Sequence, residues 1–251
     1  MLRRSLLFAG LLHASLAAAS DPVPVIVIDP GHGGSAMVGT LKERSNSSPN
    51  NATSPGGLRE KDLTLEFSRS LRTAIETRAR ETGQAVRVVL TREKDENLDF
   101  KQRAALCARP DTACIISIHF NATGGKKAMG SLAMISARKR NPNHEADERF
   151  ARGLATACHQ GVRQFLPNSK DRGVITDGHL HGGLGSNFFF QLARHRSLQS
   201  VPKCFLEVEF IDHPEVEKAL LSGDRATKFA AVAEPIAAYL VDETTGKAAT
   251  P

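Results

Sequence analysis

Short apolar runs alternate with longer amphipathic stretches along this chain, and this order restricts the possible folds more than any other feature. Continuous apolar runs occupy residues 23–28, 85–90 and 113–118, each with the length of a buried strand. Residues 59–83 and 98–108 lie between these runs and show the apolar spacing of helices. Strands that alternate with helices favour a parallel sheet with helices on its faces, so the sequence predicts an α/β fold.

The second half of the chain continues this pattern. Residues 131–135 and 203–208 are predicted strands, and residues 146–165 and 226–240 are predicted helices. A chain of 251 residues is long enough for one well-buried α/β domain and short for two. We therefore expect a single domain over residues 21–243, with a mostly parallel, mixed central sheet of about six strands and helices on both faces.

The two ends of the chain have compositions unlike the rest. Residues 1–20 combine a basic start, a short apolar middle and a small-residue end, which is the pattern of a secretory signal peptide. The apolar part is too short to cross a membrane comfortably, so no stable membrane insertion is expected. We predict export to the periplasm or, alternatively, out of the cell. Residues 244–251 are predicted to form a flexible tail.

The charge balance favours an anionic partner. The net charge is +6, and it is +4 once Arg3 and Arg4 are removed with the signal peptide. The chain has no Trp, a single tyrosine at Tyr239 and no basic run interleaved with aromatic residues, so nucleic acid is not expected. A cell-wall polymer that bears many carboxylates fits this balance.

The four cysteines suit an exported protein that retains disulfides. Cys107 and Cys114 are seven residues apart across a predicted helix-to-strand connection, and we expect them to pair. Cys158 and Cys204 are either a second bridge or two buried thiols. The absence of a CxxC motif from the sequence excludes a zinc finger.

Three polar residues stand where an α/β sheet brings distant segments together. His32 lies in the glycine-rich segment 29–34 directly after the first strand, and ligands usually bind at the carboxyl ends of such strands. His119 ends another strand, and Glu60 begins a helix. Two imidazoles and a carboxylate suit catalytic zinc, which keeps three protein ligands and lowers the pKa of its bound water toward about 7.

Glu207 in the last predicted strand is the candidate general base and then general acid. Each residue also has a plain structural interpretation: Glu60 as a charged first turn that favours the helix dipole, His119 as an ordinary strand end, and Glu207 and Glu209 as solvent-facing positions. The zinc hypothesis gains weight because most of these residues abut or lie in apolar strands, where an unpaired charge is costly.

Five ordered blocks cover almost the whole mature sequence. They are VIDPGHGG around His32, REKDLTL around Glu60, VLTR ending at Arg92 with Arg103 downstream, ISIHFNA around His119, and PKCFLEVEF around Glu207. Together they resemble the zinc-dependent N-acetylmuramoyl-L-alanine amidases of the amidase 3 type.

The resemblance implies one zinc ion per chain, held by His32, Glu60 and His119, with Glu207 as the catalytic residue. It implies hydrolysis of the amide bond between N-acetylmuramic acid and L-alanine in peptidoglycan or its muropeptide fragments. Glu209 remains a fallback for the catalytic role. Asp29 is expected either to orient the His32 imidazole or to cap the turn after the strand.

The sequence departs from the family pattern in three places. The Ser-, Asn- and Pro-rich loop 35–57 is longer than usual, and we expect it to be exposed and to shape access to the substrate. Phe120 follows His119 where a small residue is common, which predicts a bulkier cleft floor. His179 and His181 form an additional pair that is either a second metal site or part of a loop near the substrate.

Other functions fit the same residues. The nearest alternative is a zinc peptidase that cuts within the stem peptide, and a different class is a non-catalytic wall-binding protein. A secreted antibacterial toxin with the same activity is a further biological context. Nothing in the sequence resembles the inserted helix that blocks division-associated amidases, so constitutive activity is expected, and the sequence identifies no activator or inhibitor.

Overall fold

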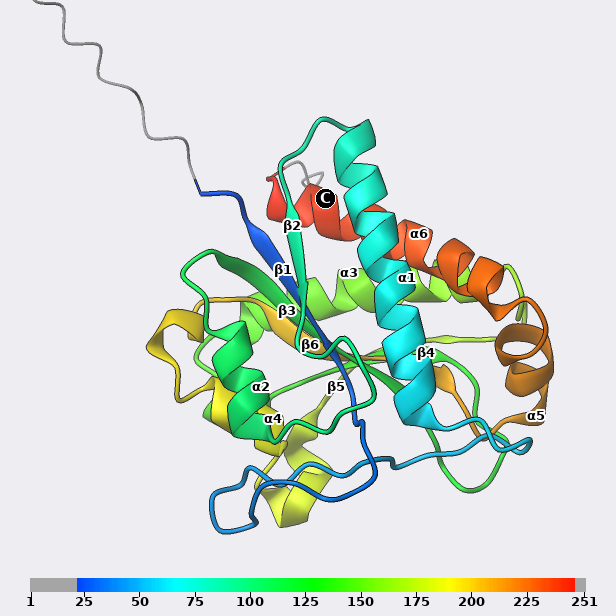
Figure 1. Ribbon diagram of the computed structural model, residues 1–251, viewed down its shortest axis with the longest axis horizontal. Coiled ribbons are helices and arrows are strands. Elements are labelled where there is room, and N and C mark those ends of the chain that lie inside the picture. Colours follow the sequence, from blue (N-terminus) through cyan, green and yellow to red (C-terminus); the bar gives the residue numbers. More distant parts are fainter. Residues whose placement is uncertain (1–21, 247–251) are drawn as a thin grey trace, which may run out of the picture.

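A six-stranded sheet forms the centre of the fold, as predicted from the alternating pattern (Figure 1). The computed structural model describes residues 22–246. The sheet has the order β2-β1-β3-β6-β4-β5. Neighbouring strands are parallel except for β4, which runs antiparallel to β6, so the sheet is mostly parallel and mixed. The strands are β1 (Val25–Pro30), β2 (Arg87–Leu90), β3 (Thr112–Asn121), β4 (Ser131–Ile135), β5 (Asp171–Thr176) and β6 (Lys203–Phe210).

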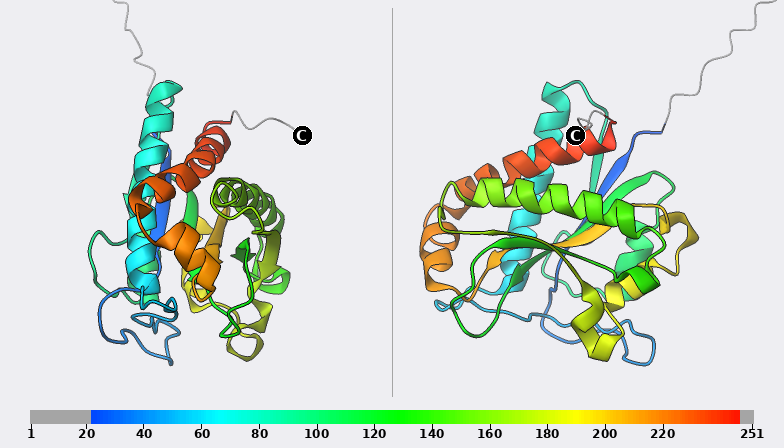
Figure 2. Two further views of the ribbon diagram at one scale, coloured as in Figure 1. Left: turned by 90° about the vertical axis from the view of Figure 1, so that its right-hand side faces the viewer. Right: turned by 180° about the vertical axis from the view of Figure 1, so that it is seen from behind.

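Helices cover both faces of the sheet (Figures 1 and 2). One face carries α1 (Glu60–Glu81), α3 (His144–Val162) and α6 (Arg225–Thr244), and the other carries α2 (Phe100–Cys107) and α4 (Asn187–Leu192). Short segments connect these layers: η1 (Arg138–Arg140), η2 (Asp177–Gly183), η3 (Arg196–Leu198), α5 (Pro214–Val216) and η4 (Glu217–Leu221). No helix within residues 22–246 is both long and apolar enough to cross a membrane.

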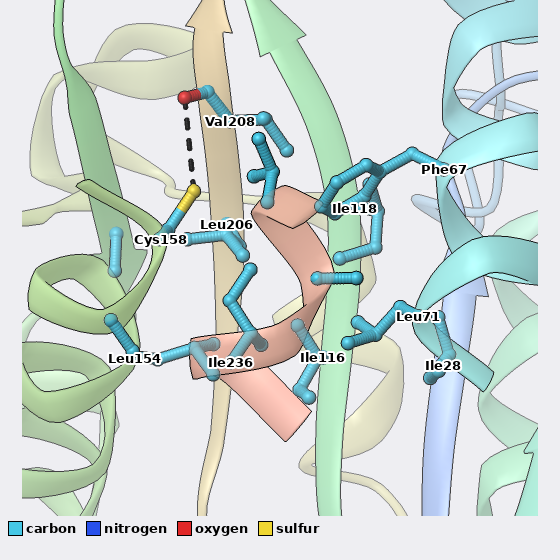
Figure 3. Packing of buried hydrophobic residues seen from close by; sticks show 14 of the residues in the cluster. Ile28, Phe67, Leu71, Ile116, Ile118, Leu154, Cys158, Leu206, Val208 and Ile236 are labelled. Carbon is cyan, nitrogen blue, oxygen red and sulfur yellow. Dashed lines mark hydrogen bonds between the residues drawn. The ribbon is translucent and has the colours of Figure 1, made fainter. Parts of the chain in front are cut away.

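The strand alternation assigns side chains to two separate apolar clusters. Ile26 and Ile28 of β1 join the larger cluster under α1, α3 and α6, whereas Val25 and Val27 face the smaller cluster under α2 and α4. The predicted stripe of α1 is fully confirmed, because its apolar side chains are at most 1% exposed. Figure 3 shows Phe67 and Leu71 of this stripe against the strand residues Ile28, Ile116 and Ile118.

Several predicted boundaries shift. β1 begins two residues later than predicted and continues to Pro30, and β3 continues past His119 to Asn121, so His119 lies inside the strand. β5 was not predicted, because this edge strand is largely exposed and polar and contains Gly173. α6 extends to Thr244. The predicted signal peptide (1–20) and most of the predicted tail (247–251) lie outside the described residues.

Phe120 does not form the cleft floor, which corrects the prediction from the sequence. Successive strand residues point to opposite faces, so Phe120 faces away from the side chain of its neighbour His119. Its ring is 2% exposed and packs in the larger cluster, with centroids 6.3 Å from Phe67 and 6.0 Å from Phe229. Phe120 is therefore a core residue.

The predicted disulfide between Cys107 and Cys114 is wrong. All four cysteines are free, buried thiols. Cys107 packs in the smaller cluster and Cys114 in the larger one, so the sheet separates their side chains. Cys158 and Cys204 are two buried thiols, as one of the two alternatives proposed. Burial raises the pKa of all four thiols, which disfavours the reactive thiolate.

Reduction is expected to leave the stability of the domain unchanged, because no disulfide links the described residues. The measurement is the free energy of unfolding in urea with and without dithiothreitol. Loss of a native disulfide costs about 2–5 kcal/mol. A reductant-dependent loss of that size would contradict the free-thiol assignment.

Candidate metal centre and neighbouring carboxyl

The structure brings together the three predicted metal ligands from three segments. His32 follows β1, Glu60 begins α1 and His119 lies near the end of β3. One ligand atom from each residue lies within 4.8 Å of the others. Glu60 is central, with Oε2 3.2 Å from His32 Nε2 and Oε1 3.1 Å from His119 Nδ1. All three side chains are buried or largely buried.

A tight turn after β1 directs His32 into this group. His32 has a φ of +61°, in the left-handed region that non-glycine residues rarely adopt. Gly31 must lack a side chain, because a Cβ there would lie 2.4 Å from the His119 ring. Thr64 of α1 donates a hydrogen bond of 2.8 Å to the Gly31 carbonyl. The glycine thus allows the turn and the His119 imidazole to meet.

Two buried arginines hold the backbone of the turn. Arg103 of α2 donates to the carbonyl oxygens of Pro30 at 2.8 Å and His32 at 2.7 Å. Arg92, which follows β2, donates to Pro30 at 3.0 Å and to Gly31 at 2.9 Å. Both arginines are 1% exposed. The turn is therefore clamped through its carbonyls by cations from two other elements.

Asp29 supports this clamp and does not contact the His32 imidazole. Its carboxylate accepts a hydrogen bond of 2.8 Å from Arg103, one of 2.7 Å from Ser117 and one from Thr91. The proposed direct orientation of His32 by Asp29 is therefore wrong. Burial raises the pKa of Asp29, but the charge of Arg103 and these hydrogen bonds outweigh it and hold the pKa below its ordinary value.

The group that orients His32 is a backbone carbonyl in the loop 35–57. Nδ1 of His32 lies 3.1 Å from the Ser48 carbonyl oxygen, so the tautomer with a proton on Nδ1 donates there and leaves Nε2 as an acceptor. Nε2 is buried and makes no hydrogen bond, although Glu60 Oε2 lies 3.2 Å away, so two acceptor atoms face each other where a metal ion would bind both. A second partner that fixes the free nitrogen of a metal-binding histidine is typical of zinc sites.

The loop 35–57 is folded against the protein and is not exposed throughout, contrary to expectation. Ser45 and Ser47 are buried, and the Ser45 carbonyl accepts a hydrogen bond of 2.9 Å from the Phe100 amide. Arg44 donates to Asn187 at 2.9 Å and so ties the loop to the start of α4. The loop therefore forms a fixed border of the site.

Burial alone does not decide the charge of Glu60. Burial raises its pKa, but the neighbouring His32 and the hydrogen bond from His119 lower it to about 2. The amide of Phe120 also donates to Glu60 Oε1, at 3.2 Å. The carboxyl group is thus held as a carboxylate, the form that binds metal ions.

Glu207 lies beside His119, on the next strand of the sheet. The two residues are paired in the register of β3 and β6, so their side chains emerge on the same face. Oε2 of Glu207 is buried without a hydrogen-bond partner, and burial raises its pKa to about 7. A carboxyl with such a pKa can take up and release a proton near neutral pH.

Glu209, the fallback for the catalytic role, has a structural environment. It is fully buried and accepts hydrogen bonds from the amides of Gly130 at 2.6 Å and Phe210 at 2.7 Å and from the Ser169 hydroxyl at 2.5 Å. These contacts connect β6 to the start of β4 and to the turn before β5. Glu209 thus helps to join these strands, and both of its carboxylate oxygens accept hydrogen bonds.

His179 and His181 do not form a second metal site in the described part of the chain. Both are exposed on η2. Among residues 22–246, the group of side chains arranged to hold a metal ion is His32, Glu60 and His119. Their two imidazoles and one carboxylate match the donor set of catalytic zinc, and the buried, unpartnered His32 Nε2 fits a ligand atom.

The fold and site define an α/β protein with a His–Glu–His candidate metal centre next to a buried carboxyl. A family model described as N-acetylmuramoyl-L-alanine amidase matches residues 26–238. The chain belongs to the N-acetylmuramoyl-L-alanine amidase family.

Two curated relatives carry the same description. The amidase AmiC of Neisseria meningitidis serogroup B is 24% identical over 220 residues, which cover 78% of this chain and 48% of the relative. AmiC of Escherichia coli O6:H1 is 31% identical over 116 residues, which cover 45% of this chain and 23% of the relative. The matched part of this chain thus spans about half, or less, of the length of these relatives.

Solved structures share the fold. An N-acetylmuramoyl-L-alanine amidase from Clostridium difficile 630 superposes with a TM-score of 0.64 at 20% identity, covering 90% of this chain and 98% of that one. AmiC2 of Nostoc punctiforme gives a TM-score of 0.59 at 24% identity, covering 87% and 98%. The predicted fold class is thereby confirmed.

The roles of Arg92, Arg103 and the Ser48 carbonyl in holding the site were not predicted from the sequence. Arg92 and Arg103 were recognised only as parts of the family blocks. An arginine beside an otherwise apolar strand or helix face is the sequence feature that could have indicated a buried structural role. The Ser48 carbonyl has no signal, because every residue carries a carbonyl.

Loss of the Asp29 charge is expected to destabilise the fold. Asp29→Asn leaves Arg103 buried without its carboxylate, which costs about 3 kcal/mol. The folded-state pKa of Asp29 is below 3.8. The variant and wild type should therefore show their full difference in unfolding free energy above that pH. It should narrow as the pH falls below 3.8 through the folded pKa, where wild-type Asp29 becomes protonated.

Urea unfolding at a series of pH values measures this difference. Asp242→Asn on α6, outside the network, is the control and should match wild type. Equal stability of Asp29→Asn and wild type at pH 7 would show that the ion pair does not hold the turn.

Zinc binding is expected to depend on the three grouped residues. His119→Ala or Glu60→Gln removes one of three ligands and should lower zinc affinity at least about tenfold. Metal analysis after dialysis against a competing chelator measures the bound zinc. His179→Ala is the matched control and should keep the wild-type content. Unchanged zinc in the Glu60 and His119 variants would exclude the site.

Proposed function

We propose that this protein is a zinc-dependent hydrolase that cleaves the amide bond between N-acetylmuramic acid and the L-alanine of the peptidoglycan stem peptide. The observation that carries this proposal is the unpartnered Glu207 carboxyl beside the His32–Glu60–His119 group, in a chain of this family. The proposed substrate is the one that the family description names.

The roles of the residues follow from their positions. His32, Glu60 and His119 would hold one zinc ion, which supplies Lewis acidity toward the amide carbonyl and lowers the pKa of water. Glu207 accepts a proton at Oε2 from the attacking water and donates it to the leaving nitrogen of L-alanine. Its pKa of about 7 suits both transfers at neutral pH.

The setting of this activity is the cell envelope. The leader-like composition of residues 1–20 supports export to the periplasm, where peptidoglycan is accessible. The sequence carries no segment resembling the inhibitory helix of division-associated amidases, which supports constitutive activity. Measurable activity of the purified protein alone tests this point, and a strict requirement for an added activator would contradict it.

Mass spectrometry of sacculi digested with zinc-loaded protein tests the proposed reaction. The expected products are stem peptides with a free L-alanine amino terminus. Glu207→Gln keeps the size of the side chain and removes its acid–base function, so kcat should fall at least about 100-fold. Glu215→Gln, on the short helix α5, is the matched control and should retain wild-type kcat.

Other product patterns have defined meanings. Cuts within the stem peptide would replace the amidase proposal with a peptidase. Absence of products from both sacculi and soluble muropeptides, with zinc bound, would indicate a wall-binding protein. Full activity of Glu207→Gln would remove Glu207 from the mechanism while leaving the reaction itself in place.

A further inference from the structure

A basic pocket of about 200 Å³ lies between the loop 35–57, α2 and α4. The positive side chains that line it are Lys42, Arg44, Lys101 and Arg194. The guanidinium groups of Arg44 and Arg194 lie against the ring of Phe190. Its one acidic side chain, Glu43, is engaged 3.0 Å from Lys101. The pocket therefore carries an excess of positive charge that the residues lining it do not neutralise.

Arg44 is fixed at this pocket without a carboxylate partner in the described structure. Its guanidinium donates to the Gly185 carbonyl at 2.9 Å and to the Asn187 amide oxygen at 2.9 Å, and it lies 4.2 Å from the centre of the Phe190 ring. These partners are neutral. Partial burial and the positive charge of Arg140 lower the pKa of Arg44, and the charge of Asp177 opposes this shift.

The pocket lies within reach of the candidate metal centre. The loop that provides Arg44 also provides Ser48, whose carbonyl is 3.1 Å from His32 Nδ1. Four residues of extended chain span at most about 14 Å, which limits the distance from Arg44 to Ser48. In Figure 1 this loop runs along the lower edge of the molecule, directly below the end of β1.

An extended peptide substrate could span a comparable distance from the candidate metal centre to the pocket. A peptide that runs away from the cleaved amide bond advances about 3.3–3.6 Å per residue, so a group three or four residues downstream lies about 10–14 Å away. Guanidinium and ammonium groups pair with carboxylates through charge-assisted hydrogen bonds. A concave pocket of this size suits one such group at the end of a chain.

We propose that this basic pocket binds a carboxylate of the stem peptide, downstream of L-alanine, and so selects anionic stem peptides. The inference rests on the proposed amidase function for the identity of the peptide. The loop 35–57 then has two roles: it orients His32 through Ser48 and contributes Lys42 and Arg44 to the substrate pocket.

Direct binding tests the pocket separately from catalysis. The probes are a synthetic stem tetrapeptide that starts with L-alanine and has free carboxylates, and the same peptide with its carboxylates converted to carboxamides. Isothermal titration calorimetry with the zinc-loaded wild-type protein should show about threefold to tenfold tighter binding of the carboxylate peptide. This preference should weaken in high salt, because surface charge pairs are screened.

The pocket variant is Lys42→Gln combined with Arg194→Gln, two exposed residues whose side chains make no hydrogen bond or ion pair within residues 22–246. Because Arg44 and Lys101 remain, this variant should lose most, but not all, of the preference for the carboxylate peptide. Arg163→Gln combined with Lys170→Gln removes the same charge beyond the end of α3 and should keep the wild-type preference. Turnover of a carboxamide substrate should be the same in this control variant as in wild type.

Three results would overturn the proposal. They are equal binding of the two peptides by wild type, an undiminished preference in the pocket variant, and pocket-dependent binding of phosphatidylglycerol vesicles with no binding of either peptide. The last result would assign the basic residues to a membrane surface. Failure of the amidase proposal would appear separately, as absence of hydrolysis, while the binding experiment still decides the pocket.

Discussion

The buried ion pair between Asp29 and Arg103 is the interaction on which the site depends. It links β1 to α2, and the same arginine holds the carbonyls of Pro30 and His32. A buried carboxylate and guanidinium are costly to remove from water, and their hydrogen bonds with Thr91, Ser117 and the turn carbonyls compensate for that cost. Arg103 therefore stabilises the backbone of the turn as well as the Asp29 carboxylate.

Much of the architecture could be predicted from the sequence, because local pattern and burial agree. Continuous apolar runs identify buried strands without any knowledge of contacts. An amphipathic helix is identified in the same way, by the four-residue spacing of Leu63, Phe67, Leu71 and Ile75. The grouping of His32, Glu60 and His119 was also predicted, since parallel strands end at one edge of the sheet.

The remaining features depend on which face or neighbour a residue meets, and spacing does not specify this. Cys107 and Cys114 are close in sequence but lie on opposite faces of the sheet. β5 was not predicted because this exposed edge strand lacks an apolar pattern. Asp29 was expected either to orient His32 or to cap the turn, yet its charged partner is an arginine 74 positions away and not the nearby histidine.

The left-handed backbone of His32 means that the proposed metal ligand opposes the stability of the fold. A non-glycine residue at a φ of +61° costs of order 1 kcal/mol, which glycine at the same position would not pay. In the metal-free protein, selection for thermostability alone would therefore favour glycine over histidine at position 32. The candidate metal centre would lose a ligand. Selection on activity opposes this change, so laboratory evolution of a more thermostable variant must screen for both properties together.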